Sequence, residues 1–352
     1  MTMTTIKSKT GYFFEDFFVG MVLRHATPKT ITEGDVALYS ALTGSRYALY
    51  SSDAFAREGD LDAAPIDPLL VFHTVFGKTV PDISLNAVAN LGYAEGQFLA
   101  PLYPGDTLSA ISEIIGVKEN STGKTGVVYV RTTGFNQEGE AILSYVRWVM
   151  VNKGDMSKSA PEPVVPDLQT CVLPENLPAP APDWAANYDG ELAGSEHAFE
   201  DYEIGEKIDH VDGMTVEEAE HQIATRLYQN TAKVHFDGVA QAESRHGKRL
   251  IYGGVVISIA RALAFNGLAN AAEILAINAG RHVNPLFAGD TIYAWSEIVD
   301  KADLGNGQGA LRVRLLATKN VRLCEFPSRD DPSVILEFDY WAAIPLRANF
   351  VF

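Results

Sequence analysis

The chain has 352 residues, of which 47% are hydrophobic and 21% charged, the balance of a folded globular protein rather than of a disordered one. Asp and Glu number 45 against 28 Lys and Arg, and the resulting formal charge of −17 disfavours binding to nucleic-acid phosphates or to an anionic membrane surface. No apolar run reaches the roughly 18 residues of a membrane span, and the first residues lack the apolar segment of a secretory signal, so we expect a cytoplasmic protein.

An internal repeat organises the chain. The motif Phe-Glu-Asp-Phe-Phe-Val-Gly at 14–20 recurs as Phe-Glu-Asp-Tyr-Glu-Ile-Gly at 199–205, an offset of 185. Pro-Gly-Asp-Thr at 104–107 recurs as Ala-Gly-Asp-Thr at 288–291, an offset of 184. Two matches at nearly one offset indicate a tandem duplication.

Each copy is expected to run as a short helix, a loop, an apolar helix and three long strands. A capping box at 215–218 starts the first helix of the second copy, and Thr32 with Asp35 is its weaker counterpart in the first. Apolar residues all round each second helix indicate burial on most sides. The expected ranges are a helix at 69–80 and strands at 107–117, 127–135 and 141–151 in the first copy, then a helix at 255–265 and strands at 291–299, 310–318 and 334–344 in the second.

A proline-rich segment at 155–195 separates the copies, because proline can continue neither a helix nor a central strand. The predicted units are therefore 1–154 and 196–352. A buried helix followed by long antiparallel strands predicts an α+β fold in which a curved sheet wraps the helix. Because each sheet alone would have exposed edges, we expect the two units to pair edge to edge, and a homo-oligomer is a further option.

The second copy carries a motif that resembles the MaoC-like hydratase family. The family motif reads roughly Gly-Asp-x-Asn-Pro-x-His, followed by His-Gly at the central helix. The stretch 228–237 keeps this spacing, with Asn230 at the family's Asp and His235 at its His. Tyr252, Gly253 and Gly254 lie where the family has His-Gly. The resemblance spans both copies and implies a double hotdog fold that hydrates or dehydrates acyl-CoA thioesters.

The first copy has lost this motif, since Ser45 and Tyr50 occupy the two catalytic positions. The resemblance implies that it accommodates the acyl group instead. The tandem layout with an eroded first copy resembles the family members that interconvert an unsaturated, methyl-branched C4 dicarboxylic acyl-CoA ester and its hydroxy derivative. That pair is the expected substrate and product.

Hydration of an enoyl thioester requires a base for water, an acid for the α-carbon and donors for the developing enolate oxygen. The resemblance makes His235 the base, and the alternative is a half-buried histidine satisfied by its neighbours. Asn230 cannot take a proton and is expected to orient water. His235 would then act as both base and acid, unless Asp237 assists; we favour a turn or cap role for Asp237.

The expected binding groups surround this motif. Gly253 and Gly254 precede the buried helix and suit the thioester oxygen, although glycine there also serves close packing. Tyr252 is expected to contact the substrate. A basic run is expected to bind the phosphates of coenzyme A, and the alternative interpretation of this run is a solvated loop. Two arginines are candidates for binding a free substrate carboxylate, and the alternative for either is a surface or structural role. The first set is Arg245, Lys248 and Arg249, with Lys319 and Arg322 as weaker candidates; the second is Arg46 and Arg281.

Three other functions stay open: a hydratase for other (R)-3-hydroxyacyl-CoA esters, an acyl-CoA thioesterase, and a non-catalytic acyl-CoA binding protein. No metal or redox cofactor is indicated, since Cys171 and Cys324 lack the spacing of a metal site or disulfide pair and are expected to be reduced thiols.

Overall fold

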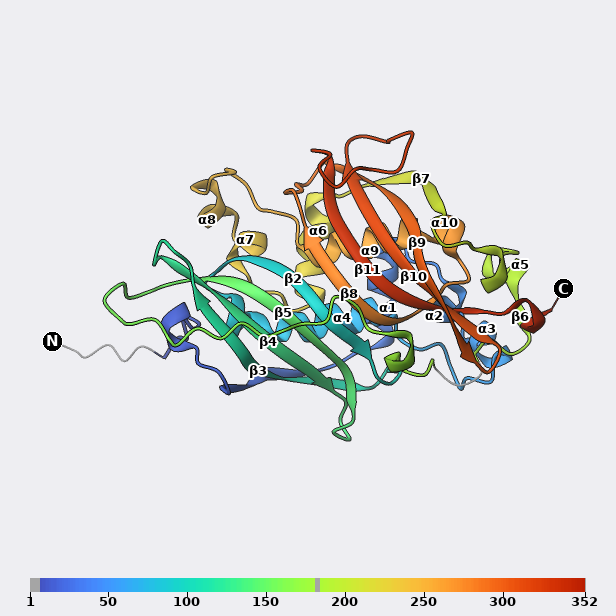
Figure 1. The fold of residues 1–352 in the computed structure, drawn as a ribbon, viewed down its shortest axis with the longest axis horizontal. Helices are drawn as coiled ribbons and strands as arrows, with labels where there is room; N and C mark the ends of the chain where they lie inside the picture. The colour runs from blue at the N-terminus through green and yellow to red at the C-terminus, as the bar shows by residue number, and fades with distance from the viewer. Residues whose placement is uncertain (1–6, 181–183, 352) are drawn as a thin grey trace.

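The computed structural model describes residues 7–180 and 184–351. Ten antiparallel strands form one continuous sheet in the order β1-β3-β4-β5-β2-β8-β11-β10-β9-β7. The first five come from the first copy and the last five from the second (Figure 1). Their bounds are Val22–Thr30 (β1), Ala87–Phe98 (β2), Thr107–Glu119 (β3), Thr125–Phe135 (β4), Ala141–Asn152 (β5), Lys207–Thr215 (β7), Glu273–His282 (β8), Thr291–Gly305 (β9), Gln308–Lys319 (β10) and Val334–Pro345 (β11).

The two halves meet where β2 pairs with β8, with Tyr93 opposite Gly280 and Gln97 opposite Ala276. Gly96 lies opposite Ile277 in this pairing, and a Cβ on Gly96 would come within 2.8 Å of the Ile277 Cβ. Glycine therefore permits the close approach of the two central strands. The predicted edge-to-edge pairing of the units is confirmed within one chain.

Each half of the sheet wraps one buried helix, α4 (Pro68–Thr79) in the first and α9 (Gly253–Leu263) in the second (Figure 1). Every residue of either helix except its first is buried. His73 of α4 bonds Ser258 of α9, Nε2 to Oγ 2.9 Å, and these residues are 185 apart, the offset of the repeat. Counterpart positions in the two copies thus face each other across the centre of the molecule.

The remaining helices lie outside these two. They are α1 (Glu33–Thr43), α2 (Ala48–Ser51), α3 (Asp53–Glu58), α5 (Gly190–Ala193), α6 (Glu218–Leu227), α7 (Lys233–Phe236), α8 (Gly238–Ala242) and α10 (Phe265–Leu268). A π-helical turn, Val80–Ser84, extends α4, and a short parallel pair joins β6 (Tyr188–Asp189) to β12 (Phe350–Val351). Helices α7 and α8 belong to residues 229–250, here called the α7–α8 loop, which stands beside β2 (Figure 1).

The repeated motifs fold alike. Both Phe-Glu-Asp sequences form 3-10 turns closed by the aspartate, which accepts from the backbone N–H three residues earlier: Phe13 to Asp16 at 3.0 Å and Ala198 to Asp201 at 2.7 Å. The glycine that ends each motif has a positive φ, +85° at Gly20 and +90° at Gly205, which explains its recurrence.

Three expectations need correction. Each half of the ten-stranded sheet has five strands rather than three, because one strand precedes the first helix and another follows the apolar helix, after the π-helical turn in the first half and after α10 in the second. The box at 215–218 is wrong: Thr215 ends β7, and α6 is capped by Glu217, whose N–H bonds the Glu220 carboxylate. The Thr32–Asp35 box is present in full. Helix α9 begins at Gly253, so the glycine pair forms its first turn rather than preceding it.

The segment at 155–195 packs against the sheet. Val164 exchanges both backbone hydrogen bonds with Val117 of β3, at 2.8 and 2.9 Å. Further on, the Val172 N–H donates to Asn278 and the Val172 carbonyl accepts from the Trp341 indole. Figure 1 shows this path across the strands of the first half. Residues 181–183 of the segment, like 1–6, lie outside the described part, and 1–154 and 196–352 remain our proposed units.

Candidate active site

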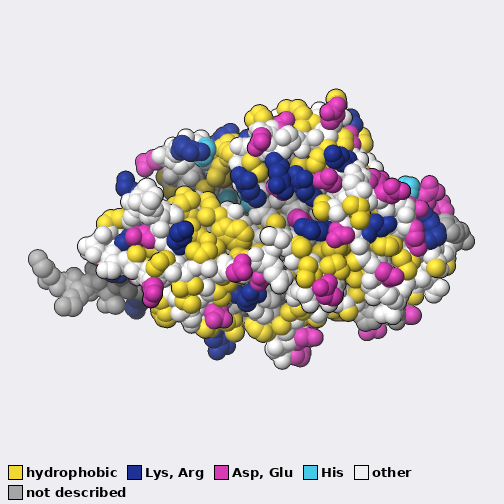
Figure 2. Space-filling view, in the orientation of Figure 1, with side chains coloured by type: hydrophobic (Ala, Val, Ile, Leu, Met, Phe, Trp, Pro, Cys, Tyr) yellow, Lys and Arg dark blue, Asp and Glu magenta, His cyan; other side chains and the backbone are white. Residues whose placement is uncertain are grey.

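A cavity of about 450 Å³ opens between the α7–α8 loop and the junction of the two halves. Figure 2 shows the corresponding hollow beside the α7–α8 loop, with Lys and Arg side chains gathered near it. Both copies supply walls: the second contributes the α7–α8 loop, the start of α9 and the end of β8, and the first contributes the π-helical turn, β2 and β5. Polar lining side chains are Ser84, Asn90, Tyr93, Arg147, Asn230, Lys233, His235, Gln241, His246, Tyr252, His282 and Asn284.

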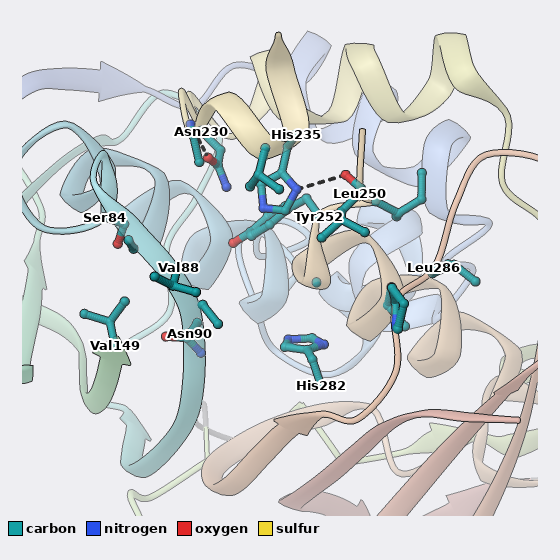
Figure 3. A pocket seen from close by; sticks show the side chains of 18 of the residues that line it. Ser84, Val88, Asn90, Val149, Asn230, His235, Leu250, Tyr252, His282 and Leu286 are labelled. Carbon is teal, nitrogen blue, oxygen red and sulfur yellow. Dashed lines mark hydrogen bonds between the residues drawn. The ribbon is translucent and has the colours of Figure 1, made fainter. Parts of the chain in front are cut away.

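His235 projects into this cavity from α7 (Figure 3). Its Nδ1 lies 2.9 Å from the Leu250 carbonyl oxygen. Because a carbonyl only accepts, Nδ1 carries the proton, and Nε2 keeps its lone pair. No described residue bonds Nε2. Burial lowers the pKa of His235 to about 4, against a smaller opposing effect of the Leu250 hydrogen bond, so the ring is neutral near pH 7.

Asn230 is almost fully buried and has a fixed orientation. Its Oδ1 accepts the Ala232 N–H at 3.0 Å, which anchors the turn before α7. The Nδ2 group therefore faces the cavity, as Figure 3 shows. Since an NH₂ group only donates, Asn230 can orient a water or a carbonyl oxygen but cannot act as a base.

Tyr252 and Gly253 form the cavity wall at the start of α9. The Val255 and Val256 N–H groups bond back to the Tyr252 carbonyl, whereas those of Gly253 and Gly254 have no partner among the described residues. Gly253 lines the cavity and Gly254 does not. An unpaired N–H at the positive end of a helix dipole is suited to a developing thioester oxyanion.

Tyr252 is held from both sides. Its backbone N–H donates to His221 Nε2 at 2.9 Å, and its ring lies 5.4 Å from that of His235, centroid to centroid. Burial raises the pKa of the Tyr252 phenol well above its usual value, so the hydroxyl remains a donor.

His282, at the end of β8, lines the cavity across from His235 (Figure 3), and sequence reasoning missed it as a site residue. Its Nε2 is shielded and has no partner among the described residues. A Cβ on Gly253 would approach that nitrogen to 2.3 Å, so only glycine leaves room for the ring. Burial, and then the charge of His235, lower the pKa of His282 to about 4. The sequence offered one signal for His282: it is a second histidine, at the end of the strand that leads into the Gly-Asp turn.

The predicted basic residues lie outside the lining of this cavity. Lys248 is exposed, with Nζ 4.2 Å from the centre of the ring of Phe287, which follows the lining residue Leu286. Arg249 pairs with Glu218, and Arg245 is exposed. Lys233 and His246, from the same loop, do line it. Of the weaker candidates, Lys319 bonds the carbonyl of the lining residue Pro285, and Arg322 pairs with Asp209.

Neither arginine predicted for a substrate carboxylate reaches the cavity. Arg46 is exposed and lies over the Phe265 ring, 4.5 Å from its centre, and Arg281 is exposed on β8. Asp237 has the predicted cap role, because its Oδ1 accepts the N–H groups of Val239 and Ala240 at the start of α8.

The equivalent place in the first half is closed. The Tyr50 hydroxyl donates to the Ala272 carbonyl at 3.3 Å, and Ser45 donates to Asp67 at 3.2 Å. The pocket beside Tyr50 measures only about 180 Å³, and Ala179 and Pro180 of the proline-rich segment line it. No side chain there resembles the open imidazole of His235.

Two further features concern the described ranges, residues 7–180 and 184–351. No group of three His, Cys, Asp or Glu side chains in those ranges is placed to hold a metal ion. Among the helices of the same ranges, none is long and apolar enough to cross a membrane.

Comparison with known proteins supplies the context for this site. The profile of the mesaconyl-CoA hydratase family matches residues 3–320. β-Methylmalyl-CoA dehydratase of Chloroflexus aurantiacus is 60% identical over 348 residues, 97% of this chain and 99% of that protein. Mesaconyl-CoA hydratase of Cereibacter sphaeroides is 57% identical over 345 residues, 97% of this chain and all of that protein.

Solved structures with the same fold support the family assignment. The crystal structure of a putative MaoC domain protein dehydratase from Chloroflexus aurantiacus superposes with a TM-score of 0.95 at 59% identity, covering 97% of this chain and 99% of that one. A double hotdog protein of Mycobacterium tuberculosis, Rv0216, superposes with a TM-score of 0.75 at 25% identity, covering 96% and 98%. The predicted double hotdog fold and the MaoC-like resemblance are confirmed.

Proposed function

Because the chain belongs to the mesaconyl-CoA hydratase family, we propose that it catalyses the reversible hydration of mesaconyl-CoA to β-methylmalyl-CoA. The observation that carries the mechanism is the His235 ring, fixed by the Leu250 carbonyl with its Nε2 lone pair directed to a cavity that both halves enclose. The function thus agrees with the hydro-lyase activity that the sequence motif implies.

The proposed reaction needs one proton carrier. A water bound at Nε2 attacks the β-carbon and gives its proton to His235, while negative charge moves through the double bond to the thioester oxygen. The unpaired Gly253 N–H stabilises that charge. The imidazolium then protonates the α-carbon, which restores the thioester and returns His235 to its neutral form. An imidazolium whose pKa is lowered to about 4 gives up its proton readily, which favours this return step.

Two other polar groups complete the arrangement. Asn230 Nδ2 is suited to hold the attacking water, since it can only donate. His282 Nε2, next to Gly253, is suited to contact the thioester oxygen from the opposite wall.

The chemistry of the lining disfavours thioester hydrolysis. A thioesterase of this fold would need a carboxylate to activate water against the carbonyl carbon. Among the described residues that line the cavity there is no Asp or Glu. Hydration at the double bond needs only the imidazole.

The experiment that tests the function is an assay of mesaconyl-CoA with the purified protein, followed by the loss of the conjugated thioester absorbance and by a thiol reagent. We expect the absorbance to fall without release of free coenzyme A. Release of the thiol would instead indicate thioester hydrolysis. Turnover of straight-chain enoyl-CoA esters but not of mesaconyl-CoA would contradict the assigned substrate.

The basic residues near the mouth, Lys233 and Lys248 above all, are our candidates for the phosphates of coenzyme A. We further propose that the enzyme is cytoplasmic and needs no metal or redox cofactor, so dialysis against a chelator should leave turnover unchanged. Light scattering during size-exclusion chromatography will show whether it forms a homo-oligomer.

A further inference from the structure

Arg147, on β5, is a buried cation with no counter-ion among the described residues. Its side chain has no exposed surface, and its guanidinium carbon lies 4.4 Å from the centre of the Phe76 ring. Nη2 donates to the Thr79 hydroxyl at 2.9 Å, but Nε and Nη1 bond no described residue. Because arginine keeps its charge, such an arrangement is destabilising unless an anion completes it.

The same guanidinium lines the main cavity, as do two other side chains whose polar atoms are unpaired among the described residues. Ser84 Oγ, at the end of the π-helical turn, and both side-chain polar atoms of Asn90, on β2, are shielded from water and have no partner among the described residues. Figure 3 shows Ser84 and Asn90 together on one side of the pocket. A guanidinium edge, a hydroxyl and an amide NH₂ form a set of donors suited to a carboxylate.

Arg147 and His235 line the same cavity, with the rings of Phe76 and Tyr252 between them. Aromatic contacts connect them: Phe76 lies 5.8 Å from Tyr252, and Tyr252 lies 5.4 Å from His235, centroid to centroid. In mesaconyl-CoA the free carboxylate is bonded to the β-carbon, the atom that receives the water. An anion subsite for it must therefore adjoin the base inside the same cavity. The phosphates of coenzyme A lie at the far end of the pantetheine arm and have no need of a buried cation here.

We propose that Arg147, with Asn90 and Ser84, binds the free carboxylate of the acyl group and so selects dicarboxylic acyl-CoA esters. The assignment rests on the proposed function and adds its specificity determinant. It replaces the exposed Arg46 and Arg281, which do not line the cavity. Holding the carboxylate also fixes the β-carbon relative to the water at His235 Nε2.

Arg261 offers a matched control. It is also buried, on α9, and lies over the Tyr47 ring at 3.9 Å, but its Nη2 is bonded to the carbonyl oxygens of Ala271 and Ala272, and it does not line the main cavity. Its replacement removes a buried guanidinium of similar surroundings without touching the proposed subsite.

The test compares mesaconyl-CoA with tiglyl-CoA, in which a methyl group replaces the carboxylate. For Arg147→Gln we expect kcat/KM for mesaconyl-CoA to fall by about 100-fold or more, as when one partner of a buried charge pair is removed, while the value for tiglyl-CoA changes little. Arg261→Gln should affect both substrates alike. If Arg147→Gln does not fold, Asn90→Ala should show the same selective loss at about 10-fold.

Equal losses for both substrates in a folded Arg147→Gln or Asn90→Ala variant, or unchanged mesaconyl-CoA turnover, would overturn the subsite while leaving the hydratase function intact. A wild-type protein that hydrates tiglyl-CoA but not mesaconyl-CoA would instead contradict the proposed function itself.

Discussion

Both halves of the molecule use the same internal supports. A histidine on each edge strand bonds a serine on the neighbouring strand, His25 to Ser112 and His210 to Ser296, with Nε2–Oγ distances of 2.7 Å in both. The threonine that ends each edge strand bonds the threonine that begins the next, Thr30 to Thr107 and Thr215 to Thr291. The duplicated scaffold has therefore kept its polar contacts at equivalent positions.

The halves differ at the motif. Tyr50, at the position of His235, is buried with its hydroxyl bonded to a backbone carbonyl, and burial raises the pKa of that phenol well above its usual value. Nearby, burial raises the pKa of Asp67 to about 6, and its carboxyl accepts from Ser45 and from the Leu69 N–H. In the second half, the ring of His235 lines the cavity, and its Nε2 bonds no described residue. The second copy thus carries the motif with His235, and the first copy contributes part of the cavity wall, including Arg147.

The largest expected effect separates His235 from its counterpart. His235→Ala should lower kcat for mesaconyl-CoA hydration by about 10²- to 10⁴-fold, because it removes the general base. Tyr50→Phe, which deletes only a hydroxyl bonded to a carbonyl, should leave turnover close to wild type. A comparable loss in Tyr50→Phe, with thermal stability unchanged, would show that the first copy also takes part in the chemistry.

The next effect concerns the close approach at α9. Gly253→Ala places a Cβ about 2.3 Å from His282 Nε2, so the ring must move and the oxyanion position is obstructed. We expect kcat/KM to fall by about 10- to 100-fold. Gly126→Ala, whose Cβ would come 2.2 Å from the Phe14 ring in the first half, is the control: it should lower the melting temperature without a comparable loss of turnover. If Gly253→Ala loses stability and turnover in the same proportion as the control, Gly253 serves packing alone.

A smaller effect distinguishes Asn230 from Ser45. Asn230→Ala removes both the hydrogen bond to the Ala232 N–H and the Nδ2 donor, and should lower turnover by about 10-fold and stability by about 1 kcal/mol. Ser45→Ala loses the bond to Asp67 and should reduce stability only. Kinetic assays with thermal unfolding of both variants will decide, and a kcat deficit in Ser45→Ala as large as in Asn230→Ala would undermine the asymmetry of the halves.

How far the sequence predicts the fold depends on the strand. Strand β4 alternates buried and half-buried residues without interruption, and its range was predicted to within two residues. Strands β1 and β7 are edge strands with mostly exposed side chains, so they lack the alternation that identifies a strand. Residues 274–278 of strand β8 are continuously buried, and such a run cannot be distinguished by periodicity from the buried helix that precedes it.

The site divides in the same way. His235, Asn230 and Gly253 belong to one local motif whose spacing is visible in the sequence, and the structure brings them together. His282 and Arg147 reach the cavity only through the pairing of β2 with β8 and of β2 with β5, contacts that no local spacing encodes. The sequence carries one signal for Arg147, because it is a charged residue within the apolar run that forms β5.

The central claim is that the neutral imidazole of His235 takes the proton of water, and the pH dependence of kcat/KM tests it most directly. Protonation of Nε2 abolishes the base, so activity should decline as the pH falls through the pKa of His235, which burial lowers to about 4. Measured by brief exposure to each pH, kcat/KM should stay level from pH 8 to about 5 and then fall, and this decline should persist in His282→Gln, which removes the other cavity imidazole whose pKa burial lowers to about 4. A level profile in His282→Gln would contradict the account.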